Sequence, residues 1–126
     1  MPWRLNVRAG PKVDKDRFDG LAPALDELER RGRELVKTAP RGEIDVMTRQ
    51  FEPVQQVAAR LEVSGPQALL PKTHAGVDVR GDGSVEAYVG RVRRVVVDQR
   101  NGEDAFAALR RVLWAQSGES APAKPS

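Results

Sequence analysis

The sequence predicts a single α+β domain in which two helices pack on one face of a mainly antiparallel sheet of about four to five strands. Three patterns support this prediction: two alternating segments joined by a Gly-Asp-Gly turn, a long helical stripe of leucines, and a shorter helical pattern near the C-terminus. The chain has 126 residues, the size of one ordinary domain. We expect the domain to span residues 1–116 and residues 117–126, which carry no large apolar side chain, to form a disordered tail.

The clearest pattern is a β-hairpin between Ala75 and Val97. Apolar residues alternate with other residues on both sides of the turn Gly81-Asp82-Gly83: Val77 and Val79 before it, and Val85, Ala87 and Val89 after it. Alternation around such a turn is a strong hairpin signal. Gly90 predicts a bulge, and the run Val95-Val96-Val97 predicts a central strand covered by helix.

Two segments have helical periodicity. The first is expected to begin after Asp19 as N-cap, and its stripe is Leu21, Leu25, Leu28, Gly32, Leu35 and Ala39. A glycine within that stripe predicts a close approach of the helix to the sheet. The second is expected to begin at Asn101 as N-cap, with Asp104 at the third helical position and a buried stripe of Phe106, Leu109, Val112 and Leu113.

The rest of the chain is less strongly patterned. Trp3, Leu5 and Val7 alternate with polar residues and predict a first strand, followed by a polar loop over residues 12–17. Residues 44–48 also alternate and predict a second strand. Residues 53–63 fit a helix and a strand equally well by period, and the Gly-Pro turn after Val63 favours a strand.

Several classes of chemistry lack the residues that they need. The chain has no cysteine and no phosphate-loop motif, and the acids Asp14, Asp16 and Asp19 lack the glycine and glutamate that complete a calcium loop, so we expect no metal site and no cofactor. The one histidine, His74, has no partnered nucleophile in the sequence and is interpreted as a loop residue. The N-terminus lacks the apolar segment of a signal peptide, and no run is long enough to span a membrane. A cytoplasmic protein without catalytic residues is therefore the expectation.

The densest basic cluster lies in the predicted hairpin. Arg91, Arg93 and Arg94 fall within four residues, with Tyr88 before them and Arg80 across the turn. Arginines beside an aromatic residue on a sheet are typical of single-strand nucleic-acid binders. Such platforms carry two or three aromatics, whereas Tyr88 stands alone, so a solvated strand face with ion pairs is the favoured interpretation.

Elimination leaves a small non-catalytic interaction or ligand-binding module as the favoured function. Trp114, off the stripe of the last helix, and Tyr88 are the candidate contacts for a protein partner or a second copy of the chain. The first alternative is a single-strand nucleic-acid binder that uses the Arg91–Arg94 strand. The second is a small-molecule binder or enzyme with a cavity between sheet and helices. The sheet face left open by the helices discriminates among them: a flat apolar patch favours a partner, a deep cavity a ligand, and a surface of arginines nucleic acid.

Overall fold

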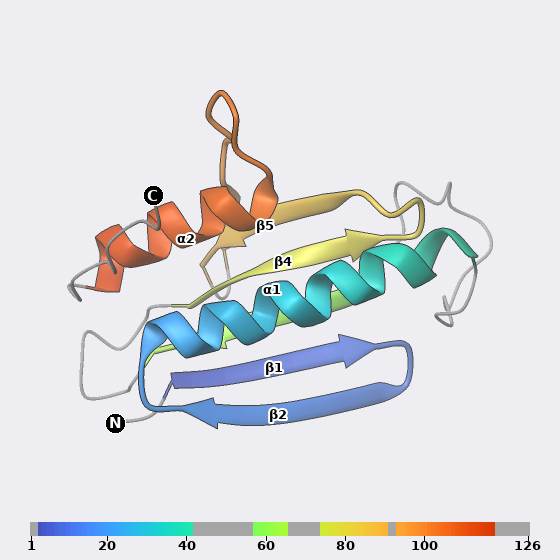
Figure 1. Cartoon of the computed structure of the whole chain (residues 1–126), viewed down its shortest axis with the longest axis horizontal. Helices are drawn as coiled ribbons and strands as arrows, with labels where there is room; N and C mark the ends of the chain where they lie inside the picture. Colours follow the sequence, from blue (N-terminus) through green and yellow to red (C-terminus); the bar gives the residue numbers. More distant parts are fainter. Residues whose placement is uncertain (1–2, 42–56, 66–73, 91–92, 118–126) are drawn as a thin grey trace.

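A six-stranded antiparallel sheet forms one layer of the computed structural model, and both helices cover the same face of it (Figure 1). The structure describes residues 3–41, 57–65, 74–90 and 93–117. In spatial order the strands are β2, β1, β3, β4, β5 and β6. Their bounds are β1 Trp3–Ala9, β2 Lys12–Phe18, β3 Val57–Ser64, β4 His74–Arg80, β5 Val85–Val89 and β6 Val95–Val96. The helices are α1, Leu21–Thr38, which ends in the 3-10 turn η1, Ala39–Arg41, and α2, Ala105–Ser117. The predicted fold class is confirmed, with slightly more strands than expected.

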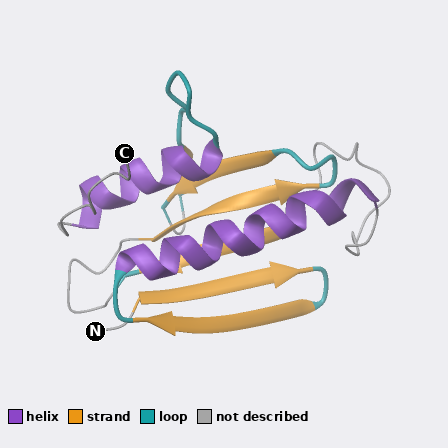
Figure 2. Ribbon diagram, viewed as in Figure 1, coloured by secondary structure: helices purple, strands orange, loops and turns teal. Residues whose placement is uncertain are grey.

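The polar segment predicted as a loop is the edge strand β2 (Figure 2). It pairs with β1 along its whole length, from Trp3 opposite Phe18 to Ala9 opposite Lys12. An edge strand needs little apolar surface, since backbone pairing with one neighbour holds it. On the helix side, Asp14 forms an ion pair with Arg31 of α1 at 2.6 Å. Tertiary pairing therefore outweighs the polar composition that predicted a loop.

The central and C-terminal strands agree in part with their sequence patterns. β3 confirms the strand interpretation over residues 57–63, whereas residues 44–48 and 53–56 lie outside the described residues. The hairpin β4–β5 has the predicted alternating register, from Ala75 opposite Val89 to Val79 opposite Val85. Gly90, with φ +101, does not bulge a continuing strand but opens the turn that leads to β6. β6 is an edge strand rather than a central one, because only β5 pairs with it.

Period-two alternation places one set of side chains from each of the central strands against the helices. The helix-side core includes Leu5 of β1, Leu61 of β3 and Val77 of β4, all fully buried. α1 buries the predicted stripe from Leu21 to Gly32 against this layer. Neither described helix is long and apolar enough to cross a membrane.

The helix starts differ from the predicted ones. The N-cap of α1 is Gly20, which makes no side-chain capping bond, rather than Asp19. In α2, Asp104 immediately precedes the first helical residue, and its carboxylate accepts the backbone N–H of Ala107 at 2.8 Å. Asp104 therefore caps α2, and Asn101 lies in a turn before it.

Gly32 makes room for the second helix rather than for the sheet. A Cβ at this position would lie 2.6 Å from Cε1 and 2.8 Å from Cζ of Phe106, but 3.9 Å from the nearest atom of Leu61. Phe106 is buried in the common core. The absence of a side chain at Gly32 is therefore what allows α1 and α2 to share the sheet face.

We expect Gly32→Leu to destabilise the domain by about 1–3 kcal/mol, because the new side chain overlaps the Phe106 ring. Chemical denaturation measures this loss. Glu34→Leu, at an exposed position of the same helix, is the control for adding a leucine to α1. A Gly32→Leu protein as stable as the control would contradict the close contact.

Candidate functional site

The sheet face turned away from the helices, called the helix-free face below, gathers most of the polar side chains of the strands. The strand register shows which residues belong to this face, because residues that lie opposite each other on neighbouring strands point to the same side of the sheet. They are Arg4, Asn6 and Arg8 of β1, Val13, Lys15 and Arg17 of β2, Val57, Arg60, Glu62 and Ser64 of β3, His74, Asp78 and Arg80 of β4, Glu86 and Tyr88 of β5, and Val96 of β6.

A chain of hydrogen bonds crosses three strands of this face. Ser64 Oγ lies 3.1 Å from Nδ1 of His74, and His74 Nε2 lies 2.7 Å from Oε2 of Glu62. Tyr88 donates its hydroxyl to the same Glu62 oxygen at 2.6 Å. His74 is the first residue of β4 rather than a loop residue, and both of its ring nitrogens have partners.

Glu62 is the common acceptor of this chain. The hydrogen bond from His74 is the main cause that lowers the pKa of Glu62 to about 2, and burial opposes it. Tyr88 and the charge of Arg94 add to the lowering. Burial and the neighbouring Glu62 carboxylate raise the pKa of Tyr88. At neutral pH this site therefore holds an ionised carboxylate and a protonated phenol.

Two guanidinium groups lie against the Tyr88 ring. The guanidinium carbons of Arg60 and Arg94 are 5.7 Å and 5.2 Å from the ring centroid. Arg60 is itself held by Asp78 through two bonds of 2.6 Å and 3.1 Å. Tyr88 is only 3% exposed, so its ring packs within the protein rather than serving as a stacking surface.

The cations of β1 and β2 have a different environment. Arg4, Arg8, Lys15 and Arg17 are exposed, and none of them forms an ion pair with another described residue. Arg4 lies directly opposite Arg17, and Arg8 lies directly opposite Arg60. Like charges in directly opposed positions destabilise a sheet. The acids of β2, Asp14 and Asp16, lie opposite the buried Val7 and Leu5, so they belong to the helix side.

No known relative accounts for this arrangement. No protein-family model, curated protein or solved structure matches the chain. The function must therefore be argued from the site itself.

Residues singled out in the sequence have mixed surroundings. Arg80 is paired with Glu86 at 2.7 Å, Arg93 is exposed, and Arg91 lies outside the described residues. Trp114 is half-buried and packs against the core. Sequence reasoning missed Arg4 and Arg8, although their alternation with buried residues in the first strand was visible. It could not place Glu62 and Ser64 beside His74, because that depends on the pairing of β3 with β4.

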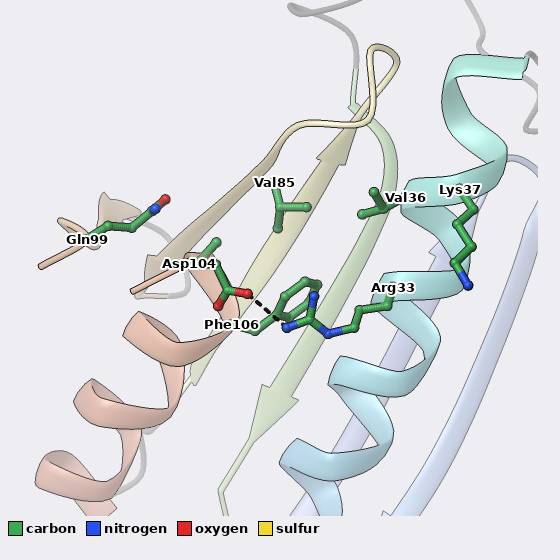
Figure 3. A pocket seen from close by; sticks show the side chains of 8 residues that line it. Arg33, Val36, Lys37, Val85, Gln99, Asp104 and Phe106 are labelled. Carbon is green, nitrogen blue, oxygen red and sulfur yellow. Dashed lines mark hydrogen bonds and ion pairs between the residues drawn. The ribbon is translucent and has the colours of Figure 1, made fainter. Parts of the chain in front are cut away.

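The helix side carries a cleft of about 410 Å³ between the end of α1, β5 and the start of α2 (Figure 3). Its walls are Arg33, Val36, Lys37, Val85, Gln99, Asp104, Ala105 and Phe106. Arg33 lies over the Phe106 ring at 4.9 Å and donates to Asp104 at 2.8 Å. Its charge is therefore already engaged within the protein.

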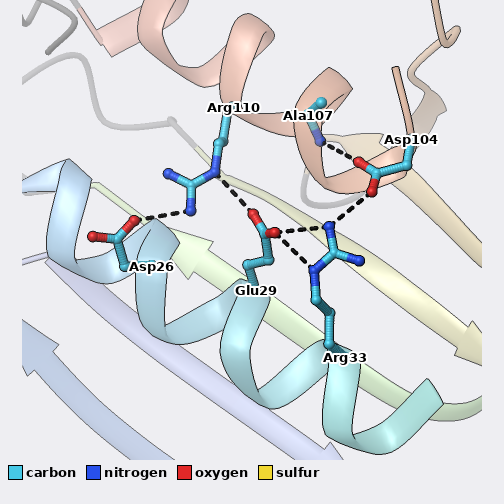
Figure 4. A network of polar contacts seen from close by, with 6 residues as sticks. All are labelled: Asp26, Glu29, Arg33, Asp104, Ala107 and Arg110. Carbon is cyan, nitrogen blue, oxygen red and sulfur yellow. Dashed lines mark hydrogen bonds and ion pairs between the residues drawn. The ribbon is translucent and has the colours of Figure 1, made fainter. Parts of the chain in front are cut away.

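A polar network ties the two helices together beside that cleft (Figure 4). Arg110 of α2 contacts Asp26 at 2.9 Å and Glu29 at 3.1 Å, both on α1. Arg33 contacts the same Glu29 and Asp104, each at 2.8 Å. Opposite charges thus meet on the helix side, whereas the β1 and β2 part of the helix-free face carries cations and no carboxylate. Within the described residues, no cluster of potential ligands could hold a metal ion.

We expect Glu62 to contribute stability that acid removes. Because folding lowers its pKa from 4.5 to about 2, the contribution is complete above pH 4.5 and falls as the pH drops towards 2. Glu62→Gln should lower stability at neutral pH and flatten the loss between pH 4.5 and 2, measured by denaturation at each pH. Glu34→Gln, at an exposed position of α1, is the control. An unchanged acid profile in Glu62→Gln would contradict the assignment.

Proposed function

We propose that this protein binds the phosphate backbone of nucleic acid with the β1–β2 half of its helix-free face. The observation that supports this most directly is the opposed pair Arg4 and Arg17. Such a pair costs stability unless an anion lies between the two charges. Features that break a local rule of sheet design are concentrated at functional sites.

The balance of charge on this half points to a polyanion. Over the described residues of β1 and β2, the helix-free face carries four cations and no carboxylate: Arg4, Arg8, Lys15 and Arg17. Arg8 lies four positions after Arg4, which is about 13 Å along a strand. Guanidinium groups fit phosphate through paired hydrogen bonds, and a row of cations contacts several phosphates of one chain.

The described residues of this face include no exposed aromatic residue, so we expect them to contact the phosphates of a nucleic acid rather than its bases. Tyr88 is buried, and Trp3 and Phe18 lie on the helix side of the sheet. Base stacking therefore has no platform among the described residues of this face. We infer binding with little sequence preference and a strong dependence on salt.

We place the nucleic-acid interface on β1 and β2 rather than on the Arg91–Arg94 strand. The sequence pointed to the Arg91–Arg94 strand, yet Arg94 lies against Tyr88 and within 3.9 Å of Glu62, and Arg80 is paired. The cations of β1 and β2 that form no ion pair with another described residue instead lie three and four strands away from β5. Each acid of the β3–β5 half already has an arginine beside it: Arg60 beside Asp78, Arg80 beside Glu86, and Arg94 beside Glu62.

We expect the double substitution Arg4→Gln and Arg17→Gln to weaken binding of a single-stranded oligonucleotide and to raise the melting temperature. Removing one phosphate interaction should reduce the slope of log affinity against log salt by about 0.7. Removing the opposed charges relieves repulsion in the free protein, so stability rises as affinity falls.

Fluorescence anisotropy at several salt concentrations measures the affinity. The control is Arg30→Gln with Lys37→Gln, which makes the same change in net charge on α1. Equal reductions in affinity in both double variants would show that only net charge matters. Absence of wild-type binding at low salt would also overturn the proposal.

A second candidate function, self-association, is favoured by the exposed edge strand β6. Val95 and Val96 are 57% and 52% exposed. Val97 donates its N–H to Ala87 of β5 at 2.9 Å, so the N–H and C=O of Val96, one residue earlier, face away from the sheet. The other edge, β2, is dominated by charged residues, which discourage pairing.

Antiparallel pairing of two β6 strands about Val96 would also match charges. This register sets Val95 opposite Val97 and Arg94 opposite Asp98 of the second copy. The two-fold axis is then perpendicular to the sheet, so both helix-free faces lie on the same side. Self-association would therefore leave both basic surfaces uncovered, at the two ends of the joined sheet.

We expect the wild-type protein to form a dimer and Val96→Asp to be monomeric, because the new carboxylates would oppose each other across the axis. Sedimentation velocity over a range of concentrations measures this. Val13→Asp, which places the same carboxylate at an exposed valine of the opposite edge strand, should remain dimeric. A monomeric wild-type protein at all concentrations would exclude this candidate.

A further inference from the structure

The geometry of Ser64, His74 and Glu62 points to a nucleophilic site: we propose that Ser64 attacks phosphodiester phosphorus, with His74 as its general base and Glu62 as the residue that positions His74. A hydroxyl, a base and an orienting carboxylate in hydrogen-bond contact are the arrangement that activates a serine. Ser64 Oγ lies 3.1 Å from Nδ1 of His74, and Nε2 of His74 lies 2.7 Å from Oε2 of Glu62. All three side chains come from the adjacent strands β3 and β4.

The direction of each hydrogen bond follows from the charge of Glu62. An ionised carboxylate only accepts hydrogen bonds, so Nε2 of His74 carries the proton in the bond to Glu62. In the neutral imidazole, Nδ1 then holds the lone pair. In that neutral state Ser64 Oγ, 3.1 Å from Nδ1, donates its proton to this lone pair. His74 is thereby set to accept the Ser64 proton, and Tyr88 holds the carboxylate from its other side.

The cations on the neighbouring strands suggest a phosphodiester as the substrate. This choice of substrate rests on the proposed binding of a phosphate backbone by β1 and β2. Arg4 of β1 lies directly opposite Ser64, and Arg17 of β2 lies directly opposite Arg4. Adjacent strands are about 4.8 Å apart. A phosphate that contacts Arg4 from the side of β3 would therefore lie beside the Ser64 hydroxyl, and the Arg4 guanidinium would stabilise its negative charge as the attack proceeds.

The reaction has two steps and consumes only the phosphodiester and one water molecule. Ser64 Oγ forms a bond to phosphorus, the bond from phosphorus to the leaving oxygen breaks, and the Ser64 proton passes to Nδ1 of His74. That proton then passes to the leaving oxygen, which departs as an alcohol. In the second step, water attacks the phosphorus of the serine phosphodiester and gives a proton to His74. The bond from phosphorus to Ser64 Oγ then breaks, and Ser64 Oγ takes that proton back from His74. Glu62 stabilises the imidazolium that forms in each step.

The test uses bis(p-nitrophenyl) phosphate, a diester whose leaving group absorbs visible light when released. Wild-type protein should release p-nitrophenolate and gain the mass of one p-nitrophenyl phosphoryl group on the peptide that contains Ser64. Ser64→Ala should abolish both signals. His74→Gln should reduce the rate about 100-fold or more and remove its rise with pH.

Ser84→Ala is the matched control. Ser84 Oγ also contacts a carboxylate, that of Asp82 at 2.6 Å, but no histidine, so its removal should leave the rate unchanged. A wild-type rate equal to that of Ser64→Ala, or an adduct on another residue, would overturn the proposal.

Oligonucleotide binding by Ser64→Ala separates this proposal from the proposed function. Binding like that of the wild type, together with no p-nitrophenolate release by either protein, would reject the nucleophile and retain the phosphate interface. Release that depends on Ser64 in a protein that binds no oligonucleotide would support the nucleophile and reject the interface.

Discussion

The covering of only one sheet face by both helices is the constraint on which the rest of the structure depends. Strand side chains alternate between the faces, so this covering divides each strand into a core row and a polar row. Leu5, Leu61 and Val77 are buried on the helix side, while Arg4, Glu62 and Asp78 occupy the other. The helix-free face thus becomes the surface on which charged side chains from five strands meet.

That covering depends on how closely the two helices approach. Phe106 of α2 occupies the space left by the missing side chain of Gly32, and Arg110 and Arg33 link the helices at the surface. Exposed ion pairs of this kind contribute little each, so apolar packing supplies most of the stability. The charges of Arg33 and Arg110 on the helix side are thus neutralised by carboxylates of the protein. Cations on β1 and β2 have no such partners among the described residues, which makes the sheet, rather than the cleft, the stronger candidate site.

The helix-free face has two parts with different chemistry. On β3, β4 and β5, acids and arginines neutralise one another around Tyr88, and Glu62 lies within hydrogen-bond distance of both His74 and Tyr88. On β1 and β2, opposed arginines remain unpaired within the part of the chain that the structure describes. Ser64 lies at the boundary, with His74 on one side and Arg4 on the other. The hydroxyl that we propose as a nucleophile therefore has a candidate base on one neighbouring strand and a cation on the other.

The sequence by itself determined the two-layer α+β class, the hairpin around Gly81-Asp82-Gly83 and the buried stripe of α1. Each rests on local periodicity, because side-chain direction follows from position along a strand or helix. Only the tertiary structure decided that residues 12–18 form a strand, that Val95 and Val96 lie at an edge, and that Gly32 accommodates Phe106. It also decided the site: Arg4 meets Arg17, and Ser64 meets His74, through strand pairing. Pairing between distant segments depends on which edges remain open after the core forms, and no local pattern in the chain encodes that.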